Sequence, residues 1–577
     1  MKQLDNIFNF TLTVKTTIVS FLRLLATAIT LLGGVQFNNC WAQNPQDFFD
    51  LEKEWQLRDS LYLYHPEMSS DEVDDIIRVY QENQAEAYYQ AYRKRIAQQE
   101  KEARSSRRSN VSRQMVTNST APEGQVPDAV EYAALEALYN ATGGDNWRYN
   151  DNWLQGTTNA DFANWFGISV QNGDVVEIFL VNNNLQGNLP AEIGNLSSVT
   201  RLHVTGNQFS NLPPEIGNLS NLTDLNLRDN QLSSLPPEIG SLSNLSYVIF
   251  NENQISSIPP EIGNLGSLTN LHLSNNQLSS LPPEIGNLSS LDALYLNNNQ
   301  LNIFPAEIGN LNSLTYLSLY GNQLSSLPAE IGNLSSLTTL FLFGNQLSSF
   351  PSEFWNLSSL ARLSIGDSQL SSLPSEIGNL SSLTSLTITT SQLSSLPAEI
   401  GNLSSLTRLS IYDNQLSSLP AEVGNLNNLT YLSIFNNQLS SLPAQIGSLS
   451  NLTQLYLYNN QFSSLPSELG NLNSLTRLYL GGNQLSPDII VQFFTGVDTY
   501  PFQIFSYLPQ NPIEKSIVVV ENSLVLTASD ESHPETNYQW QRQVNGAWQD
   551  IAGETNRELR IEEVSSDDAG DYRCRVT

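Results

Sequence analysis

Cysteine and histidine are scarce in this chain of 577 residues. Its two cysteines, Cys40 and Cys574, lie near opposite ends, so no internal disulfide framework holds the fold together. The four histidines are His65, His203, His272 and His533. The sequence also lacks a glycine-rich phosphate loop, a nucleophile elbow and a zinc-spaced cysteine set. We therefore expect a protein that is not an enzyme and that carries no cofactor.

Basic residues are also few, because 26 lysines and arginines stand against 57 aspartates and glutamates. The formal net charge is −31 and the isoelectric point is near 4.3. Most of such a surface repels nucleic acid and anionic membranes, so neither is an expected partner. The acidity favours solubility and suits cationic partners or bound divalent ions.

Long apolar runs are missing except near the N-terminus. The run Leu24–Val35 follows three basic residues and precedes Ala42, a small residue of the kind that signal peptidase requires. It is shorter than the roughly 20 residues that span a bilayer, and no later segment is apolar enough to do so. We predict a signal peptide over residues 1–42 and a secreted or cell-surface mature chain without a transmembrane segment. An uncleaved membrane anchor is the alternative.

One 23-residue unit, LTxLxLxxNQLSSLPxEIGNLSS, fills the middle of the chain. Stepping by 23 from Asn184 reaches Asn207, Asn230, Asn253, Asn276, Asn299, Asn322, Asn345, Ser368, Ser391, Asn414, Asn437, Asn460 and Asn483. Such regular spacing predicts about 14 units over residues 176–486, each of which buries its apolar side against its neighbours. We therefore predict a solenoid that presents a long surface rather than a catalytic cleft.

The sequence of one unit predicts which of its residues point into the core and where its chain turns. Leu225 and Leu227 alternate along a short strand and point inward, and Asn230 follows where the chain turns. Its side-chain amide can satisfy backbone groups of the neighbouring turns. Ser368 and Ser391 offer a smaller partner at the same place. We expect these two turns to be the most mobile of the array.

The segment before the repeats, residues 127–175, is predicted to cover their first strand. Asp128 and Glu131 indicate a helix start, and Gly143-Gly144 indicates its end. The segment also contains Trp147, Trp153 and Trp165. An uncovered first strand has a bare edge, so we expect these tryptophans to pack over it, with a ligand-binding role as the alternative.

These features resemble the leucine-rich repeat family. The stretch EYAALEALYNATGGDNW…NWL resembles the N-terminal caps of its extracellular plant-type and bacterial members, and Leu185–Pro190 is also plant-like. The later QLSSLP units are similar to the 23-residue bacterial and intracellular type. The resemblance covers about residues 128–510 and implies an α/β solenoid, a horseshoe with a parallel β-sheet on its concave face. It also implies binding, since the family binds proteins, peptides and glycans.

The remaining regions are less regular. We predict a polar helical region and linker over residues 43–126, whose basic run Arg93–Arg113 is either a solvated helix end or a docking tail. Residues 487–512 are predicted to form a C-terminal cap and linker, with a short covering helix containing Ile489, Ile490, Phe493 and Phe494.

The last segment, residues 513–577, resembles an immunoglobulin-like all-β sandwich. Trp540 would fill its core and Cys574 would lie on the strand that usually carries a cysteine, while Ala528 stands where the partner cysteine belongs. The sequence ends at Thr577 before a final strand, so we expect this domain to be truncated and incomplete.

Aromatic residues gather at strand positions that face away from the core. The early repeats carry polar residues there, and the later repeats carry tyrosine and phenylalanine. The predicted ligand-binding residues of the concave face are Tyr295, Tyr316, Tyr320, Phe341, Phe343, Arg362, Arg408, Tyr412, Tyr431, Phe435, Tyr456, Tyr458, Arg477 and Tyr479. Such rings suit interface hot spots or sugar stacking, and the arginines could steer an acidic ligand. Alternatively, the rings stabilise the sheet by pairing across strands.

A row of glutamates, one in nearly every unit from Glu192 to Glu468, lies two residues after the repeat's proline. We expect these carboxylates to stabilise the start of a helical turn, with collection of divalent cations as the alternative. Three functions remain open: adhesion or recognition of a protein ligand, binding of a polysaccharide, and a rigid surface spacer.

Overall fold

The computed structural model describes residues 129–155 and 165–485, together with strands and short stretches between residues 504 and 576. The predicted signal peptide, the region 43–126 and the covering helix around Ile489 lie outside the described residues. Within the described part, no helix has the length and apolar character needed to cross a membrane.

The segment before the repeats begins with helix α4 (Ala129–Ala141), whose Leu135 and Leu138 are fully buried. The helix is followed by Gly143, which adopts φ 72°, and by the short helix η2 (Gly144–Asn146). Strands β1 (Ile168–Gln171) and β2 (Asp174–Phe179) then form an antiparallel pair. The three tryptophans of this segment are 2–5% exposed and therefore belong to the core.

Glu131 is largely buried and ties α4 to this pair of strands. Its Oε2 accepts the backbone N–H of Val175 at 3.2 Å. The predicted capping role with Asp128 lies partly outside the described residues. The contact to β2 is one that no local sequence pattern indicates.

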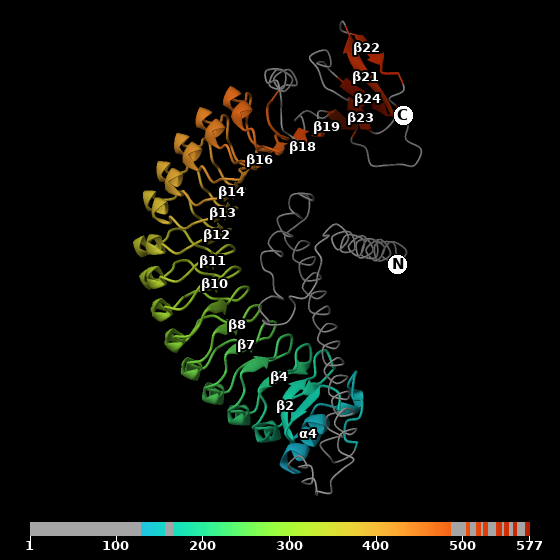
Figure 1. Cartoon of the computed structure of the whole chain (residues 1–577), viewed down its shortest axis with the longest axis vertical. Helices are drawn as coiled ribbons and strands as arrows, with labels where there is room; N and C mark the ends of the chain where they lie inside the picture. Colours follow the sequence, from blue (N-terminus) through green and yellow to red (C-terminus); the bar gives the residue numbers. More distant parts are fainter. Residues whose placement is uncertain are drawn as a thin grey trace, which may run out of the picture. The chain divides into compact units, whose positions relative to one another are not determined.

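The repeats form one parallel sheet that starts at β2 and runs along the inner side of the arc in Figure 1. Its strands are β4 (Arg201–His203), β6 (Asp224–Asn226), β7 (Tyr247–Ile249), β8 (Asn270–His272), β9 (Ala293–Tyr295), β10 (Tyr316–Ser318), β11 (Thr339–Phe341), β12 (Arg362–Gly366), β13 (Ser385–Thr389), β14 (Arg408–Tyr412), β15 (Tyr431–Ser433), β16 (Gln454–Tyr456) and β17 (Arg477–Tyr479). Consecutive strands pair without a register shift, for example Leu317 with Leu340. The predicted parallel sheet on the concave face is confirmed.

Short 3₁₀ helices, rather than α-helices, line the outer side of the arc (Figure 1). They are η3 (Ala191–Asn195), η4 (Pro214–Asn218), η5 (Pro237–Ser241), η6 (Pro260–Asn264), η7 (Pro283–Asn287), η8 (Ala306–Asn310), η9 (Ala329–Asn333), η10 (Ser352–Asn356), η11 (Ser375–Asn379), η12 (Ala398–Asn402), η13 (Ala421–Asn425), η14 (Ala444–Ser448) and η15 (Ser467–Asn471). A proline in extended conformation precedes each of them, because proline cannot continue the strand pairing but fits the start of a helical turn.

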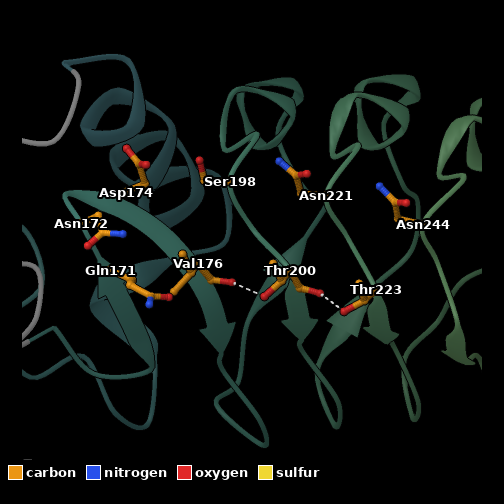
Figure 2. A pocket seen from close by; sticks show the side chains of 9 residues that line it. All are labelled: Gln171, Asn172, Asp174, Val176, Ser198, Thr200, Asn221, Thr223 and Asn244. Carbon is orange, nitrogen blue, oxygen red and sulfur yellow. Dashed lines mark hydrogen bonds between the residues drawn. The ribbon is translucent and has the colours of Figure 1, made fainter.

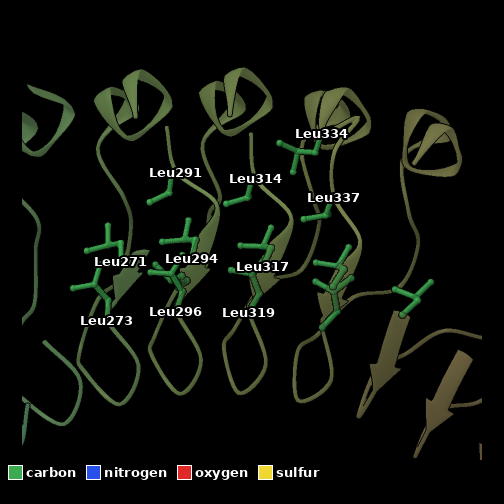
Figure 3. Close-up of a cluster of buried hydrophobic side chains, with 14 of the residues drawn as sticks. Leu271, Leu273, Leu291, Leu294, Leu296, Leu314, Leu317, Leu319, Leu334 and Leu337 are labelled. Carbon is green, nitrogen blue, oxygen red and sulfur yellow. The ribbon is translucent and has the colours of Figure 1, made fainter. Parts of the chain in front are cut away.

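Leucines fill the space between the sheet and the 3₁₀ helices. Leu294, Leu317 and Leu340 occupy the same place in successive units and are fully buried. Figure 3 shows these rows of leucines stacked from unit to unit. Burying one leucine contributes about 1.5–3 kcal/mol, and each unit repeats the contribution only if its neighbours cover it.

The buried asparagines bind the turns together. Asn276 Nδ2 donates to the carbonyl oxygens of Phe250 (2.9 Å), Leu273 (3.1 Å) and Ser274 (3.2 Å). Its Oδ1 accepts the Ile255 N–H at 3.0 Å. A bond to the preceding unit recurs at Asn207, Asn230, Asn253, Asn299, Asn322, Asn345, Asn414, Asn437, Asn460 and Asn483. The predicted role of this amide is confirmed.

The first unit is one residue longer than the 23 residues predicted for it. Glu177 pairs with Arg201, a spacing of 24 residues, because the plant-like stretch between Leu185 and Pro190 holds one residue more than its later counterparts. The fully buried amide of the first turn is therefore Asn183, whereas Asn184 is only half-buried. Counting back by 23 from Asn207 was wrong by one position.

Neighbouring 3₁₀ helices approach each other at a glycine. A Cβ on Gly217 would lie 2.6 Å from the backbone oxygen of Glu238, so only glycine allows this approach. Trp355 stands at the equivalent position of η10 and is 3% exposed. It packs with Phe350 and Phe354, and η10 and η11 approach each other less closely than other neighbouring pairs.

The C-terminal strands form two groups. β18 (Ile504–Tyr507), β19 (Lys515–Val520), β20 (Ser523–Ala528) and β23 (Glu558–Ile561) continue the sheet beyond β17. β21 (Tyr538–Val544) pairs antiparallel with β22 (Ala547–Asp550) and with β24 (Tyr572–Val576). The strands described within residues 513–577 form antiparallel pairs, and the all-β, immunoglobulin-like fold of this segment remains a prediction.

Candidate functional site

Three residues in or just after each repeat strand point outward onto the concave face. We call their positions first, middle and last, in chain order. In β14 they are Arg408, Ser410 and Tyr412, while Leu409 and Ile411 point into the core. In strands of three residues, the last position is the second residue after the strand. All fourteen predicted ligand-binding residues occupy one of these outward positions.

The strands from β2 to β8 carry charges that are matched on the face itself. Arg201 lies 3.0 Å from Glu177, and Arg228 lies 2.7 Å from Glu252. His203 Nε2 is 3.0 Å from Asp224 Oδ1, although the two atoms are not aligned for a hydrogen bond. This part of the face is polar and internally balanced.

His272 marks the border between the polar and the aromatic parts of the face. Its ring is stacked on Tyr295 with centroids 4.0 Å apart and an interplanar angle of 10°. Burial, reinforced by the charge of Arg228, lowers the pKa of His272 to about 3. The imidazole is therefore neutral at physiological pH, and burial also raises the pKa of Tyr295 to about 12.

The last positions of β10 and β11, and again those of β14, β15 and β16, carry stacked rings. Tyr320 and Phe343 lie 4.5 Å apart at an angle of 6°. Farther along, Tyr412 and Phe435 lie 4.5 Å apart at 9°, and Phe435 and Tyr458 lie 4.4 Å apart at 12°. We call this series the last-position column. Its rings cover one another's faces, so they present mainly edges to the concave side.

The middle positions of β16 and β17 form a second stack. Tyr456 and Tyr479 lie 4.7 Å apart at 11°, and Tyr456 is 1% exposed. Burial, followed by the neighbouring tyrosines, raises the pKa of Tyr456. Tyr456 therefore packs within the face, and its ligand-binding role remains a prediction.

The arginines lie at first positions. Arg408 places its guanidinium 3.7 Å from the ring centroid of Tyr431, a cation–π contact that fixes the charge at the face. Arg362 and Arg477 occupy the first positions of β12 and β17. No outward position from β9 to β17 holds a carboxylate. The outward positions of this part are therefore positive, whereas Asp367 and Asp413 directly follow the last positions of β12 and β14.

The sequence did not indicate Thr387, which occupies the middle position of β13. It is 4% exposed, and its Oγ1 has no hydrogen-bond partner among the described residues. Ser364 and Ser410 flank it on the adjoining strands and are equally buried. A buried hydroxyl without a partner is costly, and only the tertiary arrangement shows that neighbours fail to supply one.

An open hollow of about 480 Å³ lies beside β2 and β4 and is lined by polar residues. Figure 2 shows that two of them bond to neighbouring strands: Thr200 Oγ1 donates to Val176 O and Thr223 Oγ1 donates to Thr200 O, at 3.1 and 3.0 Å. These hydroxyls join units of the array, and the same bonds recur along it at Thr407 and Thr430.

The glutamate row lies in the first turn of the 3₁₀ helices, as at Glu215 and Glu284. Across the described residues, no three His, Cys, Asp or Glu side chains come together in a group that could hold a metal ion. The choice between helix stabilisation and cation collection therefore remains a prediction for these glutamates.

Comparison with known proteins assigns the repeats to described families. The matching family models are Leucine-rich repeat region (residues 237–321 and 306–412), Leucine rich repeat (427–485), Leucine Rich repeats in 2 copies (404–446) and Leucine Rich Repeat (221–242). No curated protein matches the sequence significantly.

Solved structures resemble the repeat array. A leucine-rich repeat protein of Leptospira interrogans is 41% identical, with a TM-score of 0.53, over 56% of this chain and 82% of that protein. PEPR1–AtPEP1 is 30% identical, with a TM-score of 0.55, over 65% of this chain and 55% of that chain. The plant peptide hormone receptor RGFR1 in complex with RGF2 is 32% identical, with a TM-score of 0.48, over 56% and 58%.

Proposed function

Because the chain belongs to the leucine-rich repeat family, we propose that it is an exported or cell-surface protein that binds a protein ligand through its concave face. One observation carries this proposal. Between β9 and β17 the outward positions combine aromatic rings with three arginines and hold no carboxylate, although the chain is strongly acidic. The first-position edge of this face, which carries the arginines, is complementary to an acidic partner with apolar contacts, while Asp367 and Asp413 lie at the opposite edge.

The relatives support a polypeptide partner. PEPR1, which resembles this chain over 55% of its own length, was solved with AtPEP1. The ring geometry also favours a polypeptide over a polysaccharide. Sugars stack on open ring faces, but the faces of Tyr412, Phe435 and Tyr458 lie against one another.

Export is part of the same proposal. The support comes from the N-terminal sequence, where an apolar run follows basic residues and ends near Ala42. An immunoglobulin-like module over residues 513–577 would suit adhesion at a surface. Its support is the antiparallel pairing of β21 with β22 and β24.

A structural spacer is the second candidate function, and the stacked rings favour it. Stacks at 4.4–4.7 Å stabilise a sheet whether or not a ligand binds. The two functions differ in one respect: a spacer does not require the positive charge of Arg362 and Arg408 on the same face.

The test screens the purified full chain against a random peptide display library and a panel of neutral and acidic polysaccharides. We expect the wild type to enrich peptides rich in aspartate and glutamate. The double variant Arg362→Glu/Arg408→Glu should lose that binding by about a hundred-fold, because both charges then repel the ligand.

The matched control is Arg201→Glu, which reverses a charge on the same face in its polar part. It should leave peptide binding within about two-fold of the wild type. Binding confined to a polysaccharide would contradict the polypeptide assignment. Failure to bind any probe would favour the spacer.

A further inference from the structure

We infer that the ligand completes the last-position column: a polypeptide segment places two planar side chains over Gly366 and Thr389, with acidic residues over Arg362 and Arg408. Planar side chains here are those of Phe, Tyr, Trp, His or Arg. The inference rests on the proposed function and specifies which part of the concave face makes the contact and what the ligand must contain.

The column supplies the geometric argument. Its rings repeat at 4.4–4.5 Å, close to the spacing of about 4.8 Å between neighbouring strands. Phe343 precedes Gly366 and Tyr412 follows Thr389, so two consecutive positions of an otherwise aromatic series carry no ring. Phe343 and Tyr412 are separated by three strand spacings, or about 14 Å. That separation matches two absent rings at the spacing of the column.

Gly366 is closely approached by its neighbours on the face. A Cβ at this position would collide with Thr389 Oγ1 and would lie 3.2 Å from Phe343 Cβ. The Thr389 side chain reaches only a short way from the sheet, whereas the rings on either side extend much farther. The interruption therefore cannot be filled by a small change in the side chains present.

A second observation in the same strands points to a ligand. Thr387 is two residues before Thr389 on the outward side of β13, is 4% exposed and has an unpartnered Oγ1. Its neighbours Ser364 and Ser410 are also buried on this side. A polar group of the ligand's backbone would form the hydrogen bond that Thr387 Oγ1 lacks. A bound polypeptide would thus explain both the missing rings and the unpartnered hydroxyl.

The charges on these strands supply the third argument and indicate which side chains the ligand carries. Arg362 and Arg408 lie at the first positions of β12 and β14, on either side of the strand that carries Thr387 and Thr389. Carboxylates are absent from the outward positions of these strands and their neighbours. Asp367 and Asp413 directly follow the last positions of β12 and β14. Arginine forms bidentate pairs with carboxylates, so the acidic side chains of the ligand lie over Arg362 and Arg408, away from these aspartates.

Between β11 and β12 the outer side of the array also departs from the regular pattern. Trp355 replaces the glycine of η10 in the unit that contains Phe343, and η11 belongs to the unit that contains Gly366. The two sides of the array are thus irregular together between β11 and β12.

The decisive variant is Thr389→Tyr, which adds a ring at one of the two positions. Tyrosine occupies the last position of the next strand at Tyr412, so the strand accommodates this residue. Peptides enriched by the wild-type full chain should bind Thr389→Tyr about ten-fold more weakly or worse, because the added ring takes the place of one ligand group. Val181→Tyr adds a ring at the corresponding position after β2, outside the column, and should leave affinity unchanged.

A second variant tests the same positions without adding bulk, so the result does not depend on the folding of Thr389→Tyr alone. Phe343→Leu removes one wall of the interruption without adding bulk, and should also weaken binding about ten-fold. Circular dichroism and thermal unfolding establish that each variant is folded. In the peptides, exchanging both planar residues for leucine should weaken binding as strongly as Thr389→Tyr does.

The outcomes separate the two proposals. If Thr389→Tyr and Phe343→Leu both bind as the wild type does while Arg362→Glu/Arg408→Glu does not, the concave face is the site and the inference about the column is wrong. Enriched peptides without paired planar residues would overturn it as well. If no peptide is enriched, or only a polysaccharide binds, the proposed function fails together with the inference.

Discussion

The turns of the regular units and the turns after β12 and β13 are held together by different hydrogen bonds. In a regular unit, an asparagine such as Asn276 forms four hydrogen bonds to its own and the preceding unit. At the irregular step from β11 to β13, Ser368 and Ser391 bond to each other at 2.8 Å, and Ser391 bonds to Thr389 O. The strands there lengthen from three residues to five.

The difference shows that an array of nearly identical units can specialise one place without losing register. Leucine burial and strand pairing continue unbroken through β12 and β13. The side chains that vary are those at the turns and on the two surfaces. Stability is therefore distributed along the array, while a recognition surface can be confined to a few units.

The largest expected effect concerns the tryptophan at the irregular step. Trp355→Ala should lower the free energy of unfolding by about 4 kcal/mol, because a buried aromatic side chain leaves a cavity. Urea denaturation followed by circular dichroism measures the change. A loss below about 1 kcal/mol would show that η10 and η11 close over the cavity and that the irregularity depends little on Trp355.

A smaller effect is expected from the turn amides. Asn276→Ala should cost about 3 kcal/mol, since it leaves several buried backbone groups without partners. Ser368→Ala should cost about 1 kcal/mol, because its hydroxyl makes fewer bonds. The same urea titrations compare the two variants, and equal losses would contradict the distinction between regular and irregular turns.

The outer glycines provide a third comparison. Gly217→Ala should cost about 2 kcal/mol, because the new Cβ would press on the backbone of the next unit. A Cβ on Gly266 would meet no atom within 4 Å beyond its chain neighbours. Gly266→Ala should therefore change stability by less than about 0.5 kcal/mol. Thermal unfolding of the two variants tests whether close approach, rather than glycine content, is what matters.

The smallest expected effect is a pH dependence in the regular part. The pKa of His272 falls from an ordinary value near 6.5 to about 3 in the folded protein. The unfolded chain thus binds this proton first, and stability is lost as the pH drops from about 6.5 towards 3. At about pH 5.5 the loss attributable to His272 should be about 1 kcal/mol.

The comparator for this effect is His272→Phe, which keeps a ring against Tyr295 but removes the titration. Unfolding midpoints of both proteins are measured between neutral and mildly acidic pH. Wild type should lose more stability than the variant over that interval. Parallel curves would assign the acid sensitivity to carboxylates instead.

Several features were predictable because they follow from local periodicity. The alternation of Leu225 and Leu227 with outward residues predicts the sheet and its core side, and the position of Asn230 predicts the amide that joins the turns. The predicted site residues also lie on one face for this reason. Other features depend on contacts between units and have no local pattern, such as the contact of Glu131 with β2 and the burial of Tyr456.

The sequence by itself determined that this protein is a leucine-rich repeat solenoid, since a unit repeated at a constant spacing can bury its leucines only by stacking. It also determined which residues face away from the core, because side chains alternate along a strand. The tertiary structure alone decided how those residues meet: which rings cover one another, which hydroxyl lacks a partner and where the column is interrupted. These properties depend on distances between neighbouring units, and no single unit contains them.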